Sequence, residues 1–188
     1  MISYLLAGPA SEPLALAEAK AFLRLDDDAE DALVTTLIAA ARLHVEGTSG
    51  RALLAQSWRL VLDGWPRDGV VELPVSPLIS LAGITAYDAD GDPHEIALAQ
   101  FQSEPARLLL PDHVAGMPDL RRRQGLEIDY VAGYGVDAAE VPADLRQALL
   151  TLVAYWFEHR DAVIVAGSGA VVPSGFDRLL APYRQVRL

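Results

Sequence analysis

The stretch that decides the fold is residues 144–163, DLRQALLTLVAYWFEHRDAV. Its spacing predicts a helix over about 142–160, with Pro142 in the first turn, where a missing backbone N–H costs nothing. One face of this helix should point to the subunit's own core: Leu145, Leu149, Leu152 and Trp156. Further apolar residues point elsewhere: Leu150, Val153 and Phe157. A helix that is apolar all round is buried all round, so either a β-rich insertion or a neighbouring subunit should cover this second side.

Outside this helix, the spacing of the apolar residues shows two further patterns. Apolar residues at helical spacing predict helices over about 14–24 and 29–47. Short runs with alternating apolar residues, broken by Gly, Pro and Asp, predict an antiparallel β-rich insertion over about 56–135. The expected fold class is therefore α+β: a small bundle of long helices with that insertion and an extended C-terminal tail. We expect one domain over 1–163, followed by a flexible joint and a partner-binding tail over 164–188.

Composition excludes several classes of protein. The 188 residues carry a formal net charge of -11. This charge argues against a protein that wraps nucleic acid, because such a protein neutralises many phosphates with basic side chains. The absence of cysteine excludes disulfides, thiolate catalysis and cysteine-ligated zinc. No stretch approaches the roughly 20 apolar residues that span a bilayer, and the first residues, MISYLLAGPASEP, do not resemble a secretory signal. We expect no membrane association.

Two motifs imitate catalytic or metal sites. His159-Arg160-Asp161 matches the tripeptide of protein-kinase catalytic loops, but Ala166 stands where the second metal needs an Asn. Asp88, Asp90 and Asp92 imitate the first ligands of a calcium loop, but Pro93 replaces its glycine and Ala99 its bidentate glutamate. A helix end and a solvated hairpin turn are the favoured interpretations.

Two other clusters leave alternatives open. The acidic run 26–31 could hold a hard cation, although an acidic helix start explains it more simply. Arg121-Arg122-Arg123 could contact phosphate or an acidic partner, or be merely solvated. The four histidines lack metal-ligand spacing. We therefore predict no catalytic, cofactor-binding or metal-ligating residue, and no enzyme.

Four blocks in order carry a resemblance to a known family. They are LALAEAKAFLRLDDDAEDALVTTLIAAARLHVEGTSGRAL (14–53), QSWRLVLDGWP (56–66), ELPVSPLISLAGITAYDADG (72–91) and LEIDYVAGYGVDAAEVPADLRQALLTLVAYWFEHRDAV (126–163). Together they resemble the head-tail connector proteins, also called adaptor or head completion proteins, of tailed phages and phage-derived gene transfer agents. The resemblance covers about residues 12–163.

The resemblance implies a structural role in the virion, at the head-tail interface of a particle assembled in the bacterial cytoplasm. Such connectors form a ring, usually of about twelve copies, beneath the portal protein. The ring extends the DNA channel without sequence-specific binding and docks a stopper or tail terminator protein. In similar proteins the C-terminal segment reaches towards the portal, which here implies contacts from Phe176, Arg178, Leu179, Leu180, Tyr183 and Arg184. The alternatives are a stopper or tail-tube subunit, and a small metal-dependent enzyme that uses the acidic run.

Overall fold

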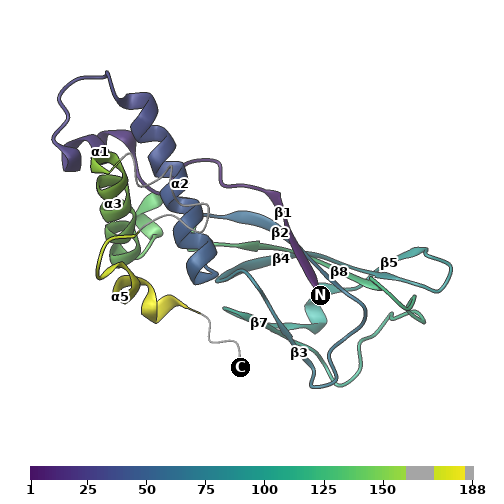
Figure 1. Ribbon diagram of the computed structural model, residues 1–188. Coiled ribbons are helices and arrows are strands. Elements are labelled where there is room, and N and C mark those ends of the chain that lie inside the picture. Colours follow the sequence, from purple (N-terminus) through teal and green to yellow (C-terminus); the bar gives the residue numbers. More distant parts are fainter. Residues whose placement is uncertain (160–171, 185–188) are drawn as a thin grey trace. The chain divides into compact units, whose positions relative to one another are not determined.

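The computed structural model describes residues 1–159 and 172–184, and these residues form two compact units (Figure 1). The sheet unit comprises Met1–Ala10 and Ala55–Tyr134. The helical unit comprises Ser11–Leu54 and the described residues from Gly135 onward. The α+β class predicted from the sequence is confirmed. The expected division at residue 163 remains a prediction; the described part of 164–188 is grouped with the helical unit.

The sheet unit is built on two antiparallel sheets. The larger has the strand order β1 (Ile2–Ala7), β2 (Gln56–Leu62), β8 (Leu126–Ala132), β4 (Leu78–Tyr87), β5 (Pro93–Glu95). The smaller has the order β3 (Val70–Glu72), β7 (Arg107–Leu109), β6 (Gln102–Glu104), and a short 3-10 helix, η1, spans Leu98–Gln100. The Asp88–Asp92 segment connects β4 to β5, so the predicted hairpin turn is confirmed.

Alternating side chains separate a buried face of the large sheet from a polar one. On β8, four residues at alternate positions are fully buried: Leu126, Ile128, Tyr130 and Ala132. Ile128 lies opposite Leu60 of β2 and Ile84 of β4, so three central strands contribute to one apolar layer. The residues between them, such as Glu127 and Asp129, turn to the other face. This alternation is what a half-buried antiparallel sheet requires.

Strand β1 is a feature that the sequence analysis did not predict. It pairs with β2 in antiparallel register, from Ile2 opposite Val61 to Ala7 opposite Ser57, with a bulge between Leu5 and Ala7. Most of its side chains are exposed, so the sequence lacks the contrast of buried and exposed positions that identifies a strand. Its pairing partners lie 50 to 59 residues away along the chain, from Ala7–Ser57 to Ile2–Val61, and a local pattern cannot reveal them.

The helical unit contains three longer helices and three short elements: α1 (Leu16–Leu23), α2 (Asp31–Ser49), α3 (Ala143–Glu158), α5 (Phe176–Leu180), η2 (Ala138–Glu140) and η3 (Ala181–Tyr183). The bounds of α1, α2 and α3 lie within two residues of the three predicted helices. Helix α2 ends at Gly50, whose φ of 70° closes the helix in the left-handed region that glycine tolerates best. None of the described helices is long and apolar enough to cross a bilayer.

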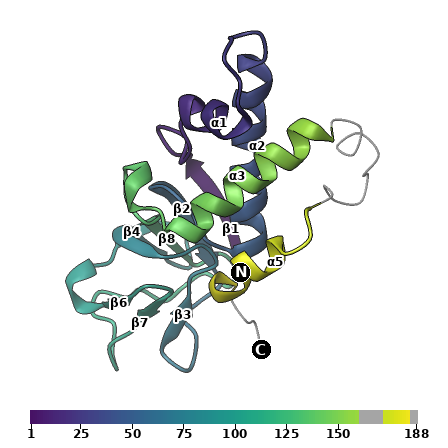
Figure 2. The ribbon, with the colours of Figure 1, turned by 90° about the vertical axis from the view of Figure 1, so that its left-hand side faces the viewer.

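Helix α3 lies across α2, with α1 and α5 beside it (Figure 2). The face predicted to point to the core is buried in full: Leu145, Leu149, Leu152 and Trp156. Helix α2 presents its own apolar stripe to the same core: Val34, Leu37, Ile38, Ala41 and Val45. The helical unit thus buries the first side of α3 within the chain.

Candidate functional site

The C-terminal segment, residues 172–184, packs against the helical unit. Phe176 and Leu180 are 1% and 0% exposed. The Phe176 ring lies beside His44 of α2, with ring centroids 5.6 Å apart, and His44 in turn meets the edge of Trp156 at 5.8 Å. Burial lowers the pKa of His44, while nearby Asp177 opposes that shift. An aromatic contact with a histidine at its centre therefore holds the segment.

Polar contacts hold the other end of the segment. The Tyr183 hydroxyl donates to Asp144 Oδ1 at 2.6 Å, at the start of α3. Arg51 Nε donates to the Tyr183 carbonyl oxygen at 3.0 Å. Within the segment, Arg184 forms an ion pair with Asp177. The segment thus has specific partners in its own chain at residues 44, 51 and 144.

This packing buries some of the residues predicted to bind the portal and leaves others accessible. Phe176 and Leu180 are buried in the chain's own core and cannot contact a partner while the segment is docked. Arg178 and Arg184 are exposed, and Leu179 and Tyr183 are half-buried. Portal binding by these six residues remains a prediction. The flexible joint expected at the start of 164–188 falls outside the described residues.

The residues predicted to face a neighbouring subunit also differ in their burial. Val153 is 1% exposed, because the chain's own helices cover it. Leu150 and Phe157 are only half-buried. A subunit contact at Leu150 and Phe157 remains a prediction, whereas Val153 has no free surface in this chain.

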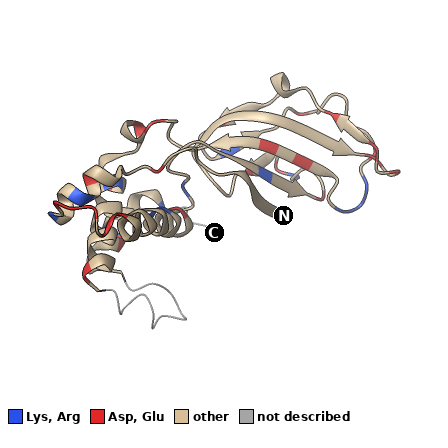
Figure 3. Cartoon of the chain, turned by 90° about the horizontal axis from the view of Figure 1, so that it is seen from above, with Lys and Arg blue, Asp and Glu red and all other residues tan. Residues whose placement is uncertain are grey.

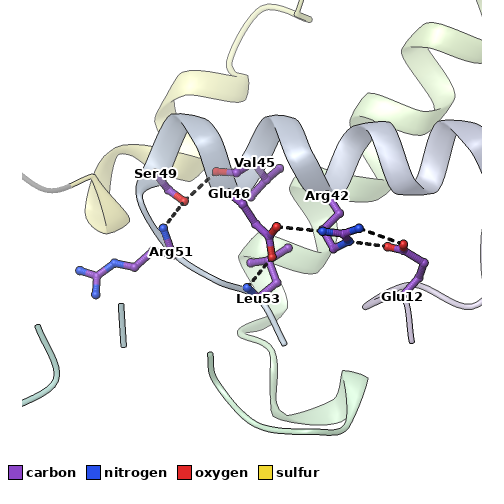
Figure 4. Close-up of polar contacts among 7 residues, drawn as sticks. All are labelled: Glu12, Arg42, Val45, Glu46, Ser49, Arg51 and Leu53. Carbon is purple, nitrogen blue, oxygen red and sulfur yellow. Dashed lines mark hydrogen bonds and ion pairs between the residues drawn. The ribbon is translucent and has the colours of Figure 1, made fainter. Parts of the chain in front are cut away.

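An ion-pair network on α2 joins the segment before α1 to the segment that follows α2 (Figure 4). Arg42 bonds Glu12 through Nε at 2.8 Å and Nη2 at 3.2 Å, and its Nη1 bonds Glu46 at 3.0 Å. The other Glu46 oxygen accepts the Leu53 backbone N–H at 2.9 Å. Burial opposes the Arg42 charge, but the two carboxylates raise its pKa overall. The network is structural, since every charge in it has a partner.

The polar face of the large sheet carries a second network. Arg59 on β2 donates to both carboxylate oxygens of Asp129, at 2.6 and 2.7 Å, and contacts Glu127 at 2.8 Å. Hydrogen bonding to Asp129 raises the pKa of Arg59 despite its desolvation. Farther along, Arg121 donates to the Gln124 carbonyl oxygen and lies 4.2 Å from the centre of the Tyr87 ring. Of the predicted basic cluster, only Arg122 and Arg123 are left exposed to solvent.

The motifs that imitate metal or catalytic sites have structural contacts. Asp88 Oδ1 accepts the backbone N–H groups of Asp90 and Asp92, and Oδ2 lies 2.8 Å from His94 Nε2, a contact that lowers the pKa of Asp88. In the acidic run, Lys20 bridges Asp28 and Asp31 at 2.6 and 2.7 Å. No metal-holding cluster of three or more His, Asp or Glu occurs among residues 1–159 and 172–184.

His159, the first residue of the kinase-like tripeptide, directly follows α3. His159 stacks on Tyr155, with ring centroids 4.4 Å apart, and its Nδ1 lies 3.0 Å from the Tyr155 carbonyl oxygen. This histidine closes the last turn of the helix. Arg160 and Asp161 lie outside the described residues.

Comparison with known proteins identifies the family. The model of the head completion protein family matches residues 14–172, from the first helix past the end of α3. The chain belongs to the head completion protein family. The resemblance predicted from the four sequence blocks is confirmed. Among curated proteins, none matches this head completion protein.

Three solved structures of similar chains come from gene transfer agent particles. A chain in the neck of an empty particle, computed with C6 symmetry, is 27% identical, with a TM-score of 0.79 over 100% of this chain and 97% of that one. A chain in the virion of a native particle is 28% identical, with a TM-score of 0.78 over the same shares. A third, from a native neck computed with C12 symmetry, is 26% identical over the same shares, with a TM-score of 0.72. All three similar chains are virion components.

Proposed function

We propose that this head completion protein is a structural connector of the virion that forms a ring beneath the portal. In this role it extends the DNA channel from the head and offers a docking surface to the stopper or tail. The observation that carries the proposal is the similarity over the full chain to proteins in the neck of gene transfer agents. A neck treated with twelvefold symmetry suits a ring of about twelve copies, in which each subunit makes heterologous contacts with two neighbours.

The charge of the chain supports a channel that conducts DNA. Its formal net charge is -11, so a ring of such subunits would repel the phosphate backbone along its length. DNA held by many basic side chains would release slowly, because each neutralised phosphate adds to the affinity. A passive, non-enzymatic wall is the role that this composition supports.

The exposed basic residues of the C-terminal segment are the proposed contact with the portal. Arg178 and Arg184 project from a segment whose apolar residues, Phe176 and Leu180, hold it on the helical unit. In this arrangement the segment can present a positive surface without leaving its own chain. Undocking of Phe176 and Leu180 would expose a larger apolar surface to the portal.

Electron microscopy of the purified portal mixed with this protein tests the proposal directly. We expect a ring of added density on one end of the portal. Density on the tail instead would support a stopper or tail-tube subunit, and absence of a ring from the portal would contradict the proposal. Calorimetric titration with millimolar Mg²⁺ or Ca²⁺ tests the enzyme alternative. A metal-dependent enzyme would have to bind the ion at the acidic run 26–31, where Lys20 pairs with Asp28 and Asp31.

The portal contact has its own test. Arg178→Glu should weaken attachment to the portal by about tenfold, because it reverses one exposed charge at the interface. Arg123→Glu, an equally exposed change in the sheet unit, is the matched control and should leave attachment unchanged. If both variants attach equally well, Arg178 is not part of the portal contact.

A further inference from the structure

The first strand leaves one edge of the large sheet open. Strand β1 is terminal in the strand order, so within the described residues only β2 pairs with it. Four of its apolar side chains are exposed by 53, 43, 46 and 46%: Ile2, Tyr4, Leu5 and Leu6. The strand contains no charged residue and no proline, the usual devices that protect an edge from pairing. The bulge at Leu6 limits the regular part of this edge to Ile2–Leu5.

A second open edge lies on β4, in the same sheet. Strand β5 pairs with β4 only from Thr85 to Tyr87, and the Leu78 N–H donates to the Pro105 carbonyl oxygen at 2.7 Å. Residues 79–82 therefore have no strand on that side among the described residues, although the register with β8 shifts at Ile79 and again at Ala82. This stretch is also uncharged, and it exposes Ile79 by 47% together with Ser80 and Ala82. A hollow of about 470 Å³ opens beside it, lined in part by Ala82 and Leu98.

Neither edge carries a charged side chain, although the chain as a whole is strongly acidic. Most of each strand of the sheet unit is drawn in the colour of uncharged residues (Figure 3). Two copies of a chain with a net charge of -11 repel each other, so a contact between copies is least costly where both surfaces are uncharged. Open strand edges also offer backbone donors and acceptors that another strand edge can satisfy.

We propose that β1 of one copy docks against the open edge of β4, residues 79–82, of the next copy. The contact joins two different surfaces of the same chain, as a heterologous ring interface requires. Apolar side chains of Ile2–Leu5 cover Ile79 and reach the hollow beside β4. The inference rests on the proposed ring, and it adds the surfaces through which neighbouring subunits meet.

Cross-linking in the assembled particle tests this contact, because the chain contains no cysteine to interfere. The double variant Leu5→Cys with Ser80→Cys is assembled on the portal and treated with a short bismaleimide. We expect a ladder of covalent oligomers in denaturing gels. Each single variant should stay monomeric, since its cysteines do not meet in a heterologous contact. The control pair Leu43→Cys with Ser80→Cys uses a helix residue that is 62% exposed, and it should give no ladder.

The possible outcomes separate the contact from the ring itself. A ring in micrographs without a cross-linked ladder overturns the β1–β4 contact and leaves the proposed function intact. Cross-linked dimers from Leu5→Cys alone also overturn it, because they would mean that β1 meets β1. If the unmodified chain forms no ring on the portal, the proposed function fails and this inference fails with it.

Charge substitution gives an independent measurement. Leu5→Lys or Ile79→Lys places a charge in the proposed contact and should lower the occupancy of the ring by about tenfold or more. Leu43→Lys makes the same change at an exposed position of the helical unit and should assemble normally. Far-UV circular dichroism confirms that each variant is folded. Normal rings from folded Leu5→Lys and Ile79→Lys would contradict the proposal.

Discussion

Arg42 on α2 holds Glu12, 30 residues earlier in the chain, by two hydrogen bonds of 2.8 and 3.2 Å. Glu12 lies on the segment that leads into α1, so this pair fastens the start of the helical unit to the middle of its longest helix. The Arg42 side chain is only 13% exposed, which distinguishes this pair from a surface salt bridge of little energetic value.

Replacing Arg42 should destabilise the helical unit. Arg42→Met keeps most of the apolar stem but leaves Glu12 and Glu46 without their cation. We expect a loss of about 2 kcal/mol in the free energy of unfolding, measured by urea denaturation. Arg107→Met removes an exposed pair with Glu104 and should change stability by less than about 0.5 kcal/mol. Equal effects of the two substitutions on the free energy of unfolding would show that the Arg42 network contributes no more than an exposed ion pair.

The pH dependence of stability should include a contribution from His44. Its pKa is lowered in the folded chain, mainly by burial against Trp156 and Phe176, so folding favours the neutral ring. This contribution is complete above the unfolded pKa of about 6.5 and is lost as the pH falls below it, because the unfolded chain binds the proton more readily. Denaturation midpoints at pH 7.5 and 5.5 should differ less in His44→Leu than in the wild type. His113→Leu, at an exposed site, should retain the wild-type difference.

The C-terminal segment should contribute to the stability of the helical unit. From the sequence alone, removal of residues 174–188 is expected to leave the fold intact, but Phe176 and Leu180 are buried. Phe176→Ala should lower the free energy of unfolding by about 3 kcal/mol, since it removes a buried ring and leaves a cavity. Arg178→Ala, at an exposed position of the same helix, should cost less than about 0.5 kcal/mol. An unchanged melting temperature for Phe176→Ala would contradict the docked arrangement.

Gly125 should tolerate no side chain. A Cβ at this position would lie 2.8 Å from the Asp63 carbonyl oxygen and 3.0 Å from that of Arg121, and backbone atoms cannot move aside cheaply. Gly125→Ala should therefore destabilise the sheet unit by about 2 kcal/mol, measured by thermal or chemical denaturation. Gly83→Ala is the matched control in the same unit, because a Cβ there meets nothing within 4 Å. A similar loss in both variants would point to glycine flexibility instead of steric conflict.

Much of the helical unit could be predicted because its information is local. Residues three and four apart share a face of a helix, so the spacing of Leu145, Leu149, Leu152 and Trp156 was enough to identify the buried side of α3. The same spacing does not identify what covers the other apolar side of α3. Val153 is covered by its own chain, whereas Leu150 and Phe157 keep exposed surface.

Signals for the missed features were weak but present. In β1, Ile2 and Tyr4 alternate with Ser3 and no charge interrupts the run, a pattern compatible with an edge strand. For His44, its place on the apolar side of α2 was visible, but its contact with Phe176 joins residues 132 positions apart. Neither pairing partner can be inferred from spacing within one segment.

The sequence by itself determined the fold class, the three longer helices within two residues, and the family, because helical periodicity and ordered blocks are properties of neighbouring residues. Only the tertiary structure decided that β1 completes the large sheet, that residues 172–184 pack on the helical unit, and that Arg42 joins Glu12 to Glu46. Each of these depends on which distant surfaces bury the most apolar area and satisfy the most polar groups together, and that balance exists only in the folded chain.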